Sequence, residues 1–197
     1  MTDIVLVRHG STSWTGHRYC GRSDPPLDAA GLAAARSLAA ALAPSLARDV
    51  LIVTSPARRA RATAEAVATA AGSVDIEVDE RWHEADIGVA EGRTFEELAA
   101  LEPDLAHALA SGASAVDWPG GETAAELEAR IAAAWIELVA RARAAVVVSH
   151  AGALRHAVAL ARSLPVGNVA FLEPATSLRV EVHSGEDEST RVLRSRP

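Results

Sequence analysis

The sequence predicts an α/β fold of three layers (α/β/α), in which helices cover both faces of a mostly parallel sheet. Short β-branched runs alternate with Ala- and Leu-rich segments along most of the 197 residues. The runs at 3–7, 49–55 and 144–150 are almost continuously apolar. Such runs are typical of parallel strands buried on both faces. With 49% apolar and 23% charged residues, the chain can bury a core of this kind.

Each element is predicted from its local pattern. The expected strands are 3–7, 49–55, 74–78, 144–150 and 177–182. The expected helices are 29–48, 56–71, 121–142 and 151–161. Pro56 after Ser55 is a helix start signal. Alternation in 177–182 favours a strand at the sheet edge.

One segment, 82–121, interrupts the alternation of strands and helices. It contains two short helical pieces, at 94–101 and 104–110, followed by the turn "WPGGE" at 118–122. We therefore expect residues 1–197 to form a single domain with an insertion, about 82–121, that covers the active site. The polar tail, 184–197, is expected to be frayed.

Composition narrows the functional classes. The net charge of −7 argues against nucleic acid or an anionic membrane as a partner. A single cysteine, Cys20, excludes an internal disulfide and a grouped-cysteine zinc site. No signal peptide or membrane-spanning run is recognisable, so a cytoplasmic protein, either monomer or homodimer, is expected.

Charged and imidazole side chains follow three of the predicted parallel strands. Arg8 and His9 follow the first, Arg59 lies shortly after the second, and His150 ends the fourth. Ligands of open α/β sheets bind at the carboxyl ends of the strands, so these groups are expected to share one site. Arg58 and Arg61 are expected to belong to the solvated face of the same helix as Arg59.

The chemistry of this set favours a phosphate ligand. Arginine binds phosphate through paired hydrogen bonds and a permanent charge. A histidine among arginines keeps a neutral nitrogen, because nearby positive charge disfavours the imidazolium. Such a nitrogen facing a phosphoryl group is a nucleophile. Glycines beside both histidines, Gly10 and Gly152, would let backbone amides approach the ligand.

At this point the chain resembles the histidine phosphatases, also called the phosphoglycerate mutase-like superfamily. Six blocks in the family's order carry the resemblance over nearly the whole chain. They are "LVRHGSTSW" (6–14), "GRSDPPLDAAGLAAA" (21–35), "TSPARRARATAEA" (54–66), "WHEADIGVAEG" (82–92), "PGGET" (119–123) and "VVVSHAGALR" (146–155).

The resemblance implies a mechanism without metal or cofactor on a small phosphorylated substrate. His9 would form a phosphohistidine, while Glu84 would protonate the leaving alcohol and then activate water. Asp86 in the same block is an equally good carboxylate by its residue type. The phosphoryl group would be held by a larger set: Arg8, Arg59, His150, Thr15, Gly21 and the amide of Ala151. Thr15 stands where the family often carries Asn.

Several functional alternatives stay open. The preferred interpretation is a metal-independent phosphomonoesterase. A phosphoglycerate mutase or an α-ribazole phosphate phosphatase shares the same core residues. A binding module for phosphorylated ligands is disfavoured by intact His9 and Glu84. A serine hydrolase using Ser149 and His150 is disfavoured because adjacent strand residues point to opposite faces.

Overall fold

A mixed sheet forms the centre of the computed structural model, which describes residues 2–72, 76–113, 115–182 and 192–193. The strand order is β3-β2-β4-β1-β5-β6. The strands are β1 (Thr2–Arg8), β2 (Leu51–Thr54), β3 (Ile76–Val78), β4 (Ala145–Ser149), β5 (Ser177–Val182) and β6 (Val192–Leu193). The first four of that order pair in parallel, and β5 pairs antiparallel with β1 and β6.

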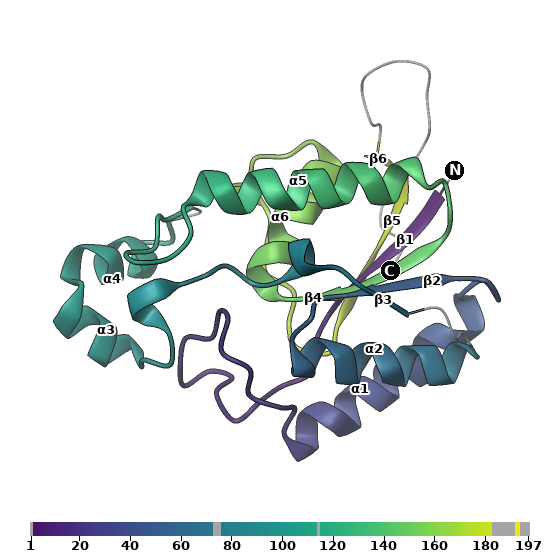
Figure 1. The fold of residues 1–197 in the computed structure, drawn as a ribbon, viewed down its shortest axis with the longest axis horizontal. Coiled ribbons are helices and arrows are strands. Elements are labelled where there is room, and N and C mark those ends of the chain that lie inside the picture. The colour runs from purple at the N-terminus through teal and green to yellow at the C-terminus, as the bar shows by residue number, and fades with distance from the viewer. Residues whose placement is uncertain (1, 73–75, 114, 183–191, 194–197) are drawn as a thin grey trace.

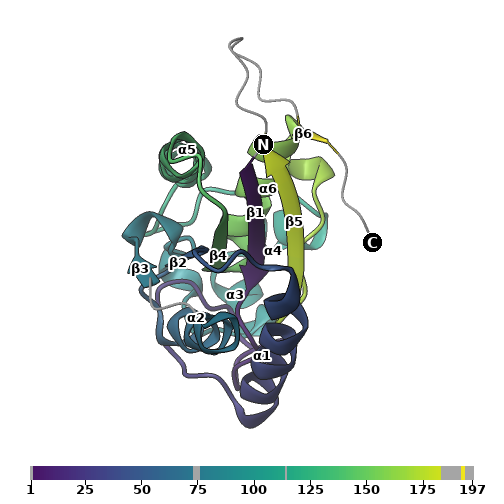
Figure 2. The same cartoon turned by 90° about the vertical axis from the view of Figure 1, so that its right-hand side faces the viewer.

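Helices cover both faces of this sheet, and the predicted three-layer fold is confirmed (Figures 1 and 2). The helices are α1 (Ala29–Leu42), α2 (Arg58–Ala71), α3 (Phe95–Leu101), α4 (Pro103–Ala110), α5 (Ala124–Ala140) and α6 (Ala151–Arg162). Short 3₁₀ turns occupy Ala43–Ser45, Glu80–Trp82, Gly88–Ala90 and Val166–Asn168.

The apolar strand runs supply both cores because successive side chains point to opposite faces. Ile4 and Leu6 of β1 pack in the larger core with residues of α5 and α6. Val5 and Val7 pack in the smaller core with residues of α1 and α2. All four are at most 2% exposed, so β1 is buried on both sides, as its continuous apolar sequence indicates.

Some predicted boundaries differ from the structure. The predicted edge strand, β5, pairs with β1 along its length, while the two-residue strand β6 pairs only with Glu181 and Val182. Among the described residues, 177–180 therefore stay at the sheet edge, and only the end of the strand is covered. This strand also runs antiparallel to β1, unlike the four parallel strands. Pro56 lies outside α2, whose N-cap is Ala57; the first helical amide, that of Arg58, donates to Asp24 Oδ1 at 2.7 Å.

Other boundary differences concern the helix ends. α1 ends at Leu42 and passes into a 3₁₀ turn that contains Pro44. α5 begins at Ala124, after a capping box of Thr123 and Glu126. Of the predicted strand 74–78, the first two residues lie outside the described ones. So does the predicted frayed tail, apart from β6 at 192–193.

The 82–121 segment projects from the end of the sheet at which the parallel strands finish (Figure 1). α3 begins with a capping box of Thr94 and Glu97 and packs against α4. The start of the segment is anchored by Trp82, which is 1% exposed in the larger core. The segment therefore stands next to the predicted site.

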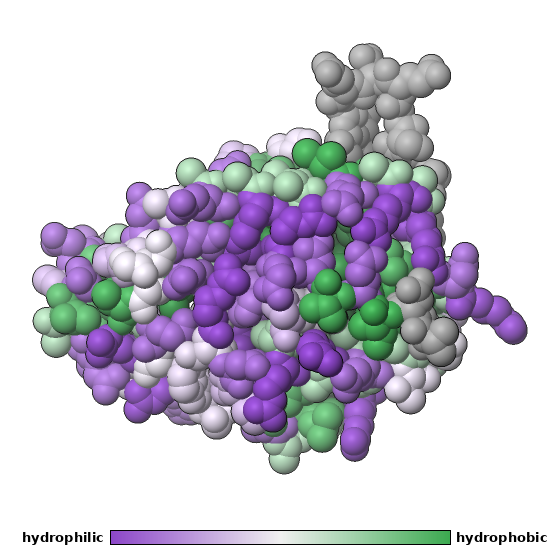
Figure 3. All heavy atoms as spheres, in the orientation of Figure 1, coloured by the Kyte–Doolittle hydropathy of each residue, from purple (hydrophilic) through white to green (hydrophobic). Residues whose placement is uncertain are grey.

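The face seen in Figure 3 is mostly hydrophilic, with apolar residues near α3 and along the β3 edge. On β3, Ile76 and Val78 are exposed, and Leu101 is exposed at the end of α3. In the part of the chain that the structure describes, no helix has the length and apolar character needed to cross a membrane.

Candidate active site

The strand register brings the two predicted histidines together. β1 and β4 run parallel with Arg8 opposite Ser149, and the His9 amide donates to the Ser149 carbonyl at 3.1 Å. His9 and His150 therefore leave neighbouring strand ends at the same level. Their ring centroids are 5.0 Å apart in an edge-to-face arrangement.

His9 presents one ring nitrogen as a base. Its Nδ1 lies 2.7 Å from the Gly10 carbonyl, which can only accept, so Nδ1 carries the proton. Nε2 is then unprotonated and accepts from Arg59 Nε at 3.2 Å. Burial, reinforced by the charge of Arg59, lowers the pKa of His9 to about 3. The imidazole is neutral at pH 7, in agreement with the sequence-based expectation.

Arg59 lies on the first turn of α2 and is 1% exposed. Besides His9, its guanidinium donates to the carbonyls of Ser23 at 2.6 Å and Gly21 at 2.9 Å. These bonds fix the guanidinium beside the His9 ring. The carboxylate of Asp24 lies 3.9 Å from it, too far for a hydrogen bond, so neutral carbonyls hold the cation in place. Arg58 and Arg61 are exposed, as predicted.

His150 is 1% exposed and is oriented by a serine at the end of β2. Its Nε2 lies 2.7 Å from Ser55 Oγ, which itself accepts from the Ala57 amide. The Ser55 proton is thus available for Nε2, an arrangement that leaves the imidazole proton on Nδ1. Burial lowers the pKa of His150 well below its ordinary value, so the ring is a neutral donor.

Two buried side-chain donors at the site have no hydrogen-bond partner among the described residues: His150 Nδ1 and Arg8 Nε. Arg8 ends β1, and its other side-chain contact is a bond to the Leu172 carbonyl at 2.7 Å. Unsatisfied buried donors are costly in a folded protein. An anion beside His9 would satisfy both donors.

Glu84 sits at the N-terminus of α6. Its carboxylate accepts from the amides of Gly152 at 2.9 Å and Ala153 at 3.1 Å, and from the Ala85 amide at 3.0 Å. These bonds fix its position, and a helix N-terminus favours a negative group. Asp86, the other carboxylate of this block, is exposed and accepts from the Gly88 amide instead.

Arg130 of α5 holds the backbone that carries Glu84. It donates to the carbonyls of Arg81, His83 and Glu84 at 2.7–3.0 Å, and it pairs with Glu122 at 2.6 Å. Its spacing in the sequence gives no signal of this role, because the three carbonyls lie 46 to 49 residues away along the chain. Glu122 therefore anchors Arg130. The N-cap of α5 is the next residue, Thr123.

A third histidine, His83, stacks on His150 with ring centroids 5.5 Å apart and an interplanar angle of 9°. Its Nδ1 accepts from the Glu84 amide at 3.0 Å. Burial, followed by the charges of Arg22 and Arg59, lowers the pKa of His83 to about 4. His83 supports the site rather than facing solvent. Its position next to Glu84 was the only sequence signal for this role.

Three more predicted phosphate-binding residues take different places. Thr15 lines the same cavity as His9, and its Oγ1 accepts from the Thr12 amide at 2.9 Å. Ala151 begins α6 and also lines that cavity. Gly21 acts through its backbone: its carbonyl holds Arg59 and its amide donates to Glu91 at 3.0 Å.

The glycines beside the histidines serve packing. A Cβ on Gly10 would lie 2.4 Å from the Gly31 carbonyl oxygen at the start of α1. A Cβ on Gly152 would lie 2.5 Å from Glu84 Oε1. A side chain at either position is therefore excluded by contacts within the protein, and not, as expected from the sequence, by the approach of a ligand. Gly10 admits α1, and Gly152 admits the carboxylate.

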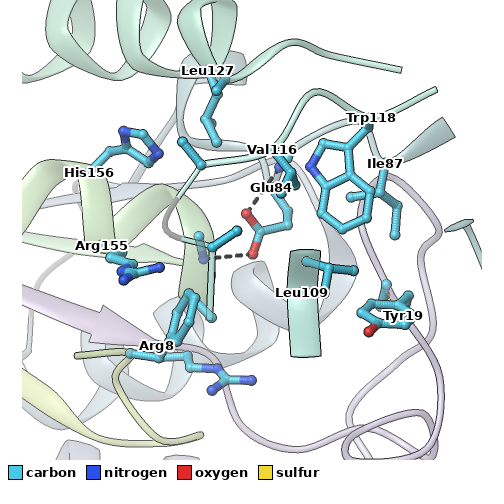
Figure 4. Close-up of a pocket in the computed structure, with 18 residues that line it drawn as sticks. Arg8, Tyr19, Glu84, Ile87, Leu109, Val116, Trp118, Leu127, Arg155 and His156 are labelled. Carbon is cyan, nitrogen blue, oxygen red and sulfur yellow. Dashed lines mark hydrogen bonds between the residues drawn. The ribbon is translucent and has the colours of Figure 1, made fainter. Parts of the chain in front are cut away.

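Two adjoining cavities surround these groups. The smaller, about 180 Å³, is lined by Arg8, His9, Thr15, Arg59, Glu84 and Ala151, among others. The larger, about 500 Å³, also has Glu84 in its lining (Figure 4). Among the described residues, no cluster of three or more His, Cys, Asp or Glu side chains is placed to hold a metal ion.

The serine hydrolase alternative finds no support in this geometry. Ser149 Oγ donates to the Trp82 carbonyl at 2.6 Å, away from His150. Ser55, which does contact His150, is fully buried and orients that ring. Its position at the end of β2 is the same signal that singled out the other strand-end residues.

Comparison with known proteins agrees with the geometry. Probable phosphoglycerate mutase GpmB of Salmonella paratyphi C is 38% identical over 135 residues, which cover 68% of this chain and 61% of GpmB. The match thus spans less than two thirds of that relative. A mycobacterial glucosyl-3-phosphoglycerate phosphatase, solved with VO3, has a TM-score of 0.84 at 29% identity, with coverage of 98% and 97%.

Another solved structure, Bacillus stearothermophilus YhfR, has a TM-score of 0.83 at 26% identity and covers 98% of this chain and 95% of its own. The family model of the histidine phosphatase superfamily (branch 1) matches residues 4–194. This match confirms the family predicted from the six sequence blocks. The chain, with its neutral strand-end histidine between two arginines, belongs to branch 1 of the histidine phosphatase superfamily.

Proposed function

We propose that the protein is a metal-independent phosphomonoesterase that hydrolyses small phosphorylated metabolites through a phosphohistidine at His9. One observation carries this proposal. His9, with Nε2 unprotonated, lines the smaller cavity together with Arg8, and its ring lies 5.0 Å from that of His150. Two buried donors of these neighbours, Arg8 Nε and His150 Nδ1, have no partner among the described residues. An equatorial phosphoryl oxygen accepts well from such donors.

In the first step, His9 Nε2 forms a bond to phosphorus while the bond from phosphorus to the alcohol oxygen breaks. Glu84 gives its proton to that oxygen, so the alcohol leaves neutral. The proton balance closes over the cycle, because Glu84 regains a proton from water in the second step. Arg8 and Arg59 stabilise the negative charge on the phosphoryl oxygens throughout.

In the second step, water attacks phosphorus and loses a proton to the Glu84 carboxylate. The P–N bond breaks, inorganic phosphate forms, and His9 returns to its neutral form. The Nδ1–H bond to the Gly10 carbonyl is kept in both steps, so the ring does not turn. Glu84 lines both cavities, whereas the exposed Asp86 is absent from the described lining of either, which supports Glu84 as the acid and base.

The test is to trap the intermediate. After rapid quench with ³²P-labelled substrate, acid-labile and alkali-stable label is expected on His9. His9→Ala should carry no label and should lose turnover by at least about 10⁴-fold, as removal of a nucleophile does. Label on Ser11 or Ser55 in the wild-type protein would contradict the proposal.

The second candidate is a phosphoglycerate mutase, favoured by the similarity to GpmB. It would return the phosphoryl group from His9 to a second hydroxyl of the glycerate instead of to water. With 3-phosphoglycerate as substrate, release of inorganic phosphate and formation of 2-phosphoglycerate can be measured in one reaction. We expect phosphate release to dominate. Faster isomer formation would assign the chain to the mutases.

A further inference from the structure

The larger cavity lies where the alcohol part of a phosphomonoester must extend. Both cavities are lined by Arg8, Glu84 and Ala151, but His9 and Arg59 line only the smaller one. A phosphoryl group attacked by His9 expels its leaving oxygen on the side away from the imidazole, because displacement at phosphorus is in line. Glu84 marks that side, so the leaving alcohol points into the larger cavity.

The wall contributed by the 82–121 segment and the start of α5 is apolar. Its side chains include Ile87, Leu109, Val116, Trp118 and Leu127, and Glu84 is the one charged residue among the described residues that the segment and the start of α5 contribute to the lining. Figure 4 shows Trp118, Ile87 and Leu109 on one side of Glu84, with Arg155 and His156 on the other. Trp118 is braced by Tyr19, whose ring lies edge-to-face at 6.2 Å.

The polar residues on the opposite side of the larger cavity already contact other groups of the protein. Arg8 and Glu84 belong to the proposed phosphoryl machinery. Arg155 donates to the Val169 carbonyl at 2.8 Å and stacks over the Phe171 ring at 4.4 Å. Burial lowers the pKa of His156, which keeps it neutral at pH 7. Arg155 keeps its positive charge, because the Val169 carbonyl and the Phe171 ring are neutral. On the wall across from it, where the uncharged side chains of the 82–121 segment predominate, an apolar alcohol would gain contact and an anionic one would find no cation among the described residues.

We propose that the larger cavity selects phosphomonoesters of apolar alcohols, with an aliphatic chain or aromatic ring packed on Leu109, Val116 and Trp118. This inference rests on the proposed function and adds the substrate class. A volume of about 500 Å³ holds a leaving group much larger than glycerate. Burial of one methylene is worth about 0.8 kcal/mol, equal to about a fourfold rise in kcat/KM.

The test uses a homologous series from ethyl to hexyl phosphate, with 3-phosphoglycerate as the anionic comparison. The n-alkanols have nearly equal acidity, so the proton donated by Glu84 is worth the same in each. We expect kcat/KM to rise about fourfold for each methylene that the wall covers, and hexyl phosphate to exceed 3-phosphoglycerate.

Two variants connect the slope to the wall. Leu109→Lys should flatten the chain-length dependence and raise the relative rate on 3-phosphoglycerate, since it places a cation in the cavity. Val116→Thr, which keeps the shape of the side chain, should lower the slope by less. Leu101→Lys is the matched control. Leu101 is 49% exposed at the end of α3, so its substitution adds the same charge outside the cavity.

Three results would overturn the inference. One is a flat chain-length series in the wild-type protein, and another is a faster reaction with 3-phosphoglycerate than with hexyl phosphate. A third is a Leu101→Lys variant that loses the slope as completely as Leu109→Lys. Absence of hydrolysis of every ester, including p-nitrophenyl phosphate, would overturn the proposed function itself. A flat series with active turnover would remove only the substrate class.

Discussion

The two cavities that meet at Glu84 are built differently. The smaller one is lined by charged and imidazole groups: Arg8 and His9 at the end of β1, Arg59 on the first turn of α2, and Glu84. The larger one is walled by Ala, Leu, Val, Ile and Trp side chains of an inserted segment outside the sheet. The difference teaches that the groups proposed to bind the phosphoryl group come mainly from strand ends and α2, while the insertion contributes Glu84 and the apolar wall proposed to contact the alcohol.

The largest expected effect concerns Glu84, which both cavities share. Glu84→Gln should slow hydrolysis of alkyl phosphates by about 10²–10⁴-fold, the usual worth of a general acid. Phosphorylation of His9 by p-nitrophenyl phosphate should slow much less, because p-nitrophenolate leaves without a proton. The burst phase, measured apart from steady-state turnover, separates the two steps.

Asp86→Asn is the matched control for this variant. It removes a neighbouring carboxylate that is exposed, and it should leave both rates nearly unchanged. Equal burst losses for the two substrates in Glu84→Gln would mean that Glu84 positions phosphate and donates no proton. A crippled Asp86→Asn with normal Glu84→Gln would reverse the assignment.

Arg130 holds the backbone beside Glu84, and its loss should lower both stability and activity. Arg130→Met leaves Glu122 without its partner and the carbonyls of 81, 83 and 84 without a donor. We expect a loss of about 3 kcal/mol in the free energy of unfolding, as for other truncated buried ion pairs. Denaturant unfolding measures it.

The double variant Arg130→Met/Glu122→Met sharpens that test. Removal of both charges should recover part of the lost stability, since no unpaired carboxylate is then left. If Arg130 also positions Glu84, kcat for alkyl phosphates should stay low in the double variant while KM changes little. Full recovery of both stability and kcat would restrict Arg130 to pairing with Glu122.

The cluster of neutral histidines should make folding sensitive to acid. His9, with a folded pKa of about 3, and His83, with about 4, bind fewer protons than an unfolded histidine near 6.5. The unfolded state is therefore favoured as the pH falls from 6.5 toward 4 and then 3. Stability is present above pH 6.5 and drops by up to about 1.4 kcal/mol per pH unit for each histidine.

Urea unfolding at pH 5, 6 and 7.5 gives that slope. His9→Gln should reduce it, because one titrating group is removed from the site. His107→Gln, on the exposed face of α4, is the control and should keep the wild-type slope. Equal free energies of unfolding at pH 5 and 7.5 would show that these imidazoles are not held neutral in the folded protein.

The smallest expected effect is that of chelation. Charge on the phosphoryl oxygens is assigned to arginines, so prolonged dialysis against EDTA should leave kcat within about twofold. Rates are compared before and after readdition of Mg²⁺. A large loss that Mg²⁺ restores would show that the anion site is incomplete without a cation.

Part of the site could be predicted from short sequence patterns, because several of its residues directly follow a predicted strand. Arg8, His9 and His150 are placed by parallel register alone once their strands are recognised. Ser55, Thr63 and Arg130 were missed, since their roles depend on contacts between distant elements. The Gly10 amide donates to Thr63 Oγ1 at 3.2 Å, for example, across 53 positions of the chain.

The sequence by itself determined the α/β class, the family and the groups at the strand ends, because apolar period and short motifs are local properties. Only the tertiary structure decided which nitrogen of His9 carries the proton, what holds Glu84, and that an apolar wall adjoins the cavity lined by His9. Those features come from side chains of separate helices and loops meeting in space. The physical reason is that burial and hydrogen-bond pairing, which set the pKa of His9 and the position of Glu84, exist only after the elements pack.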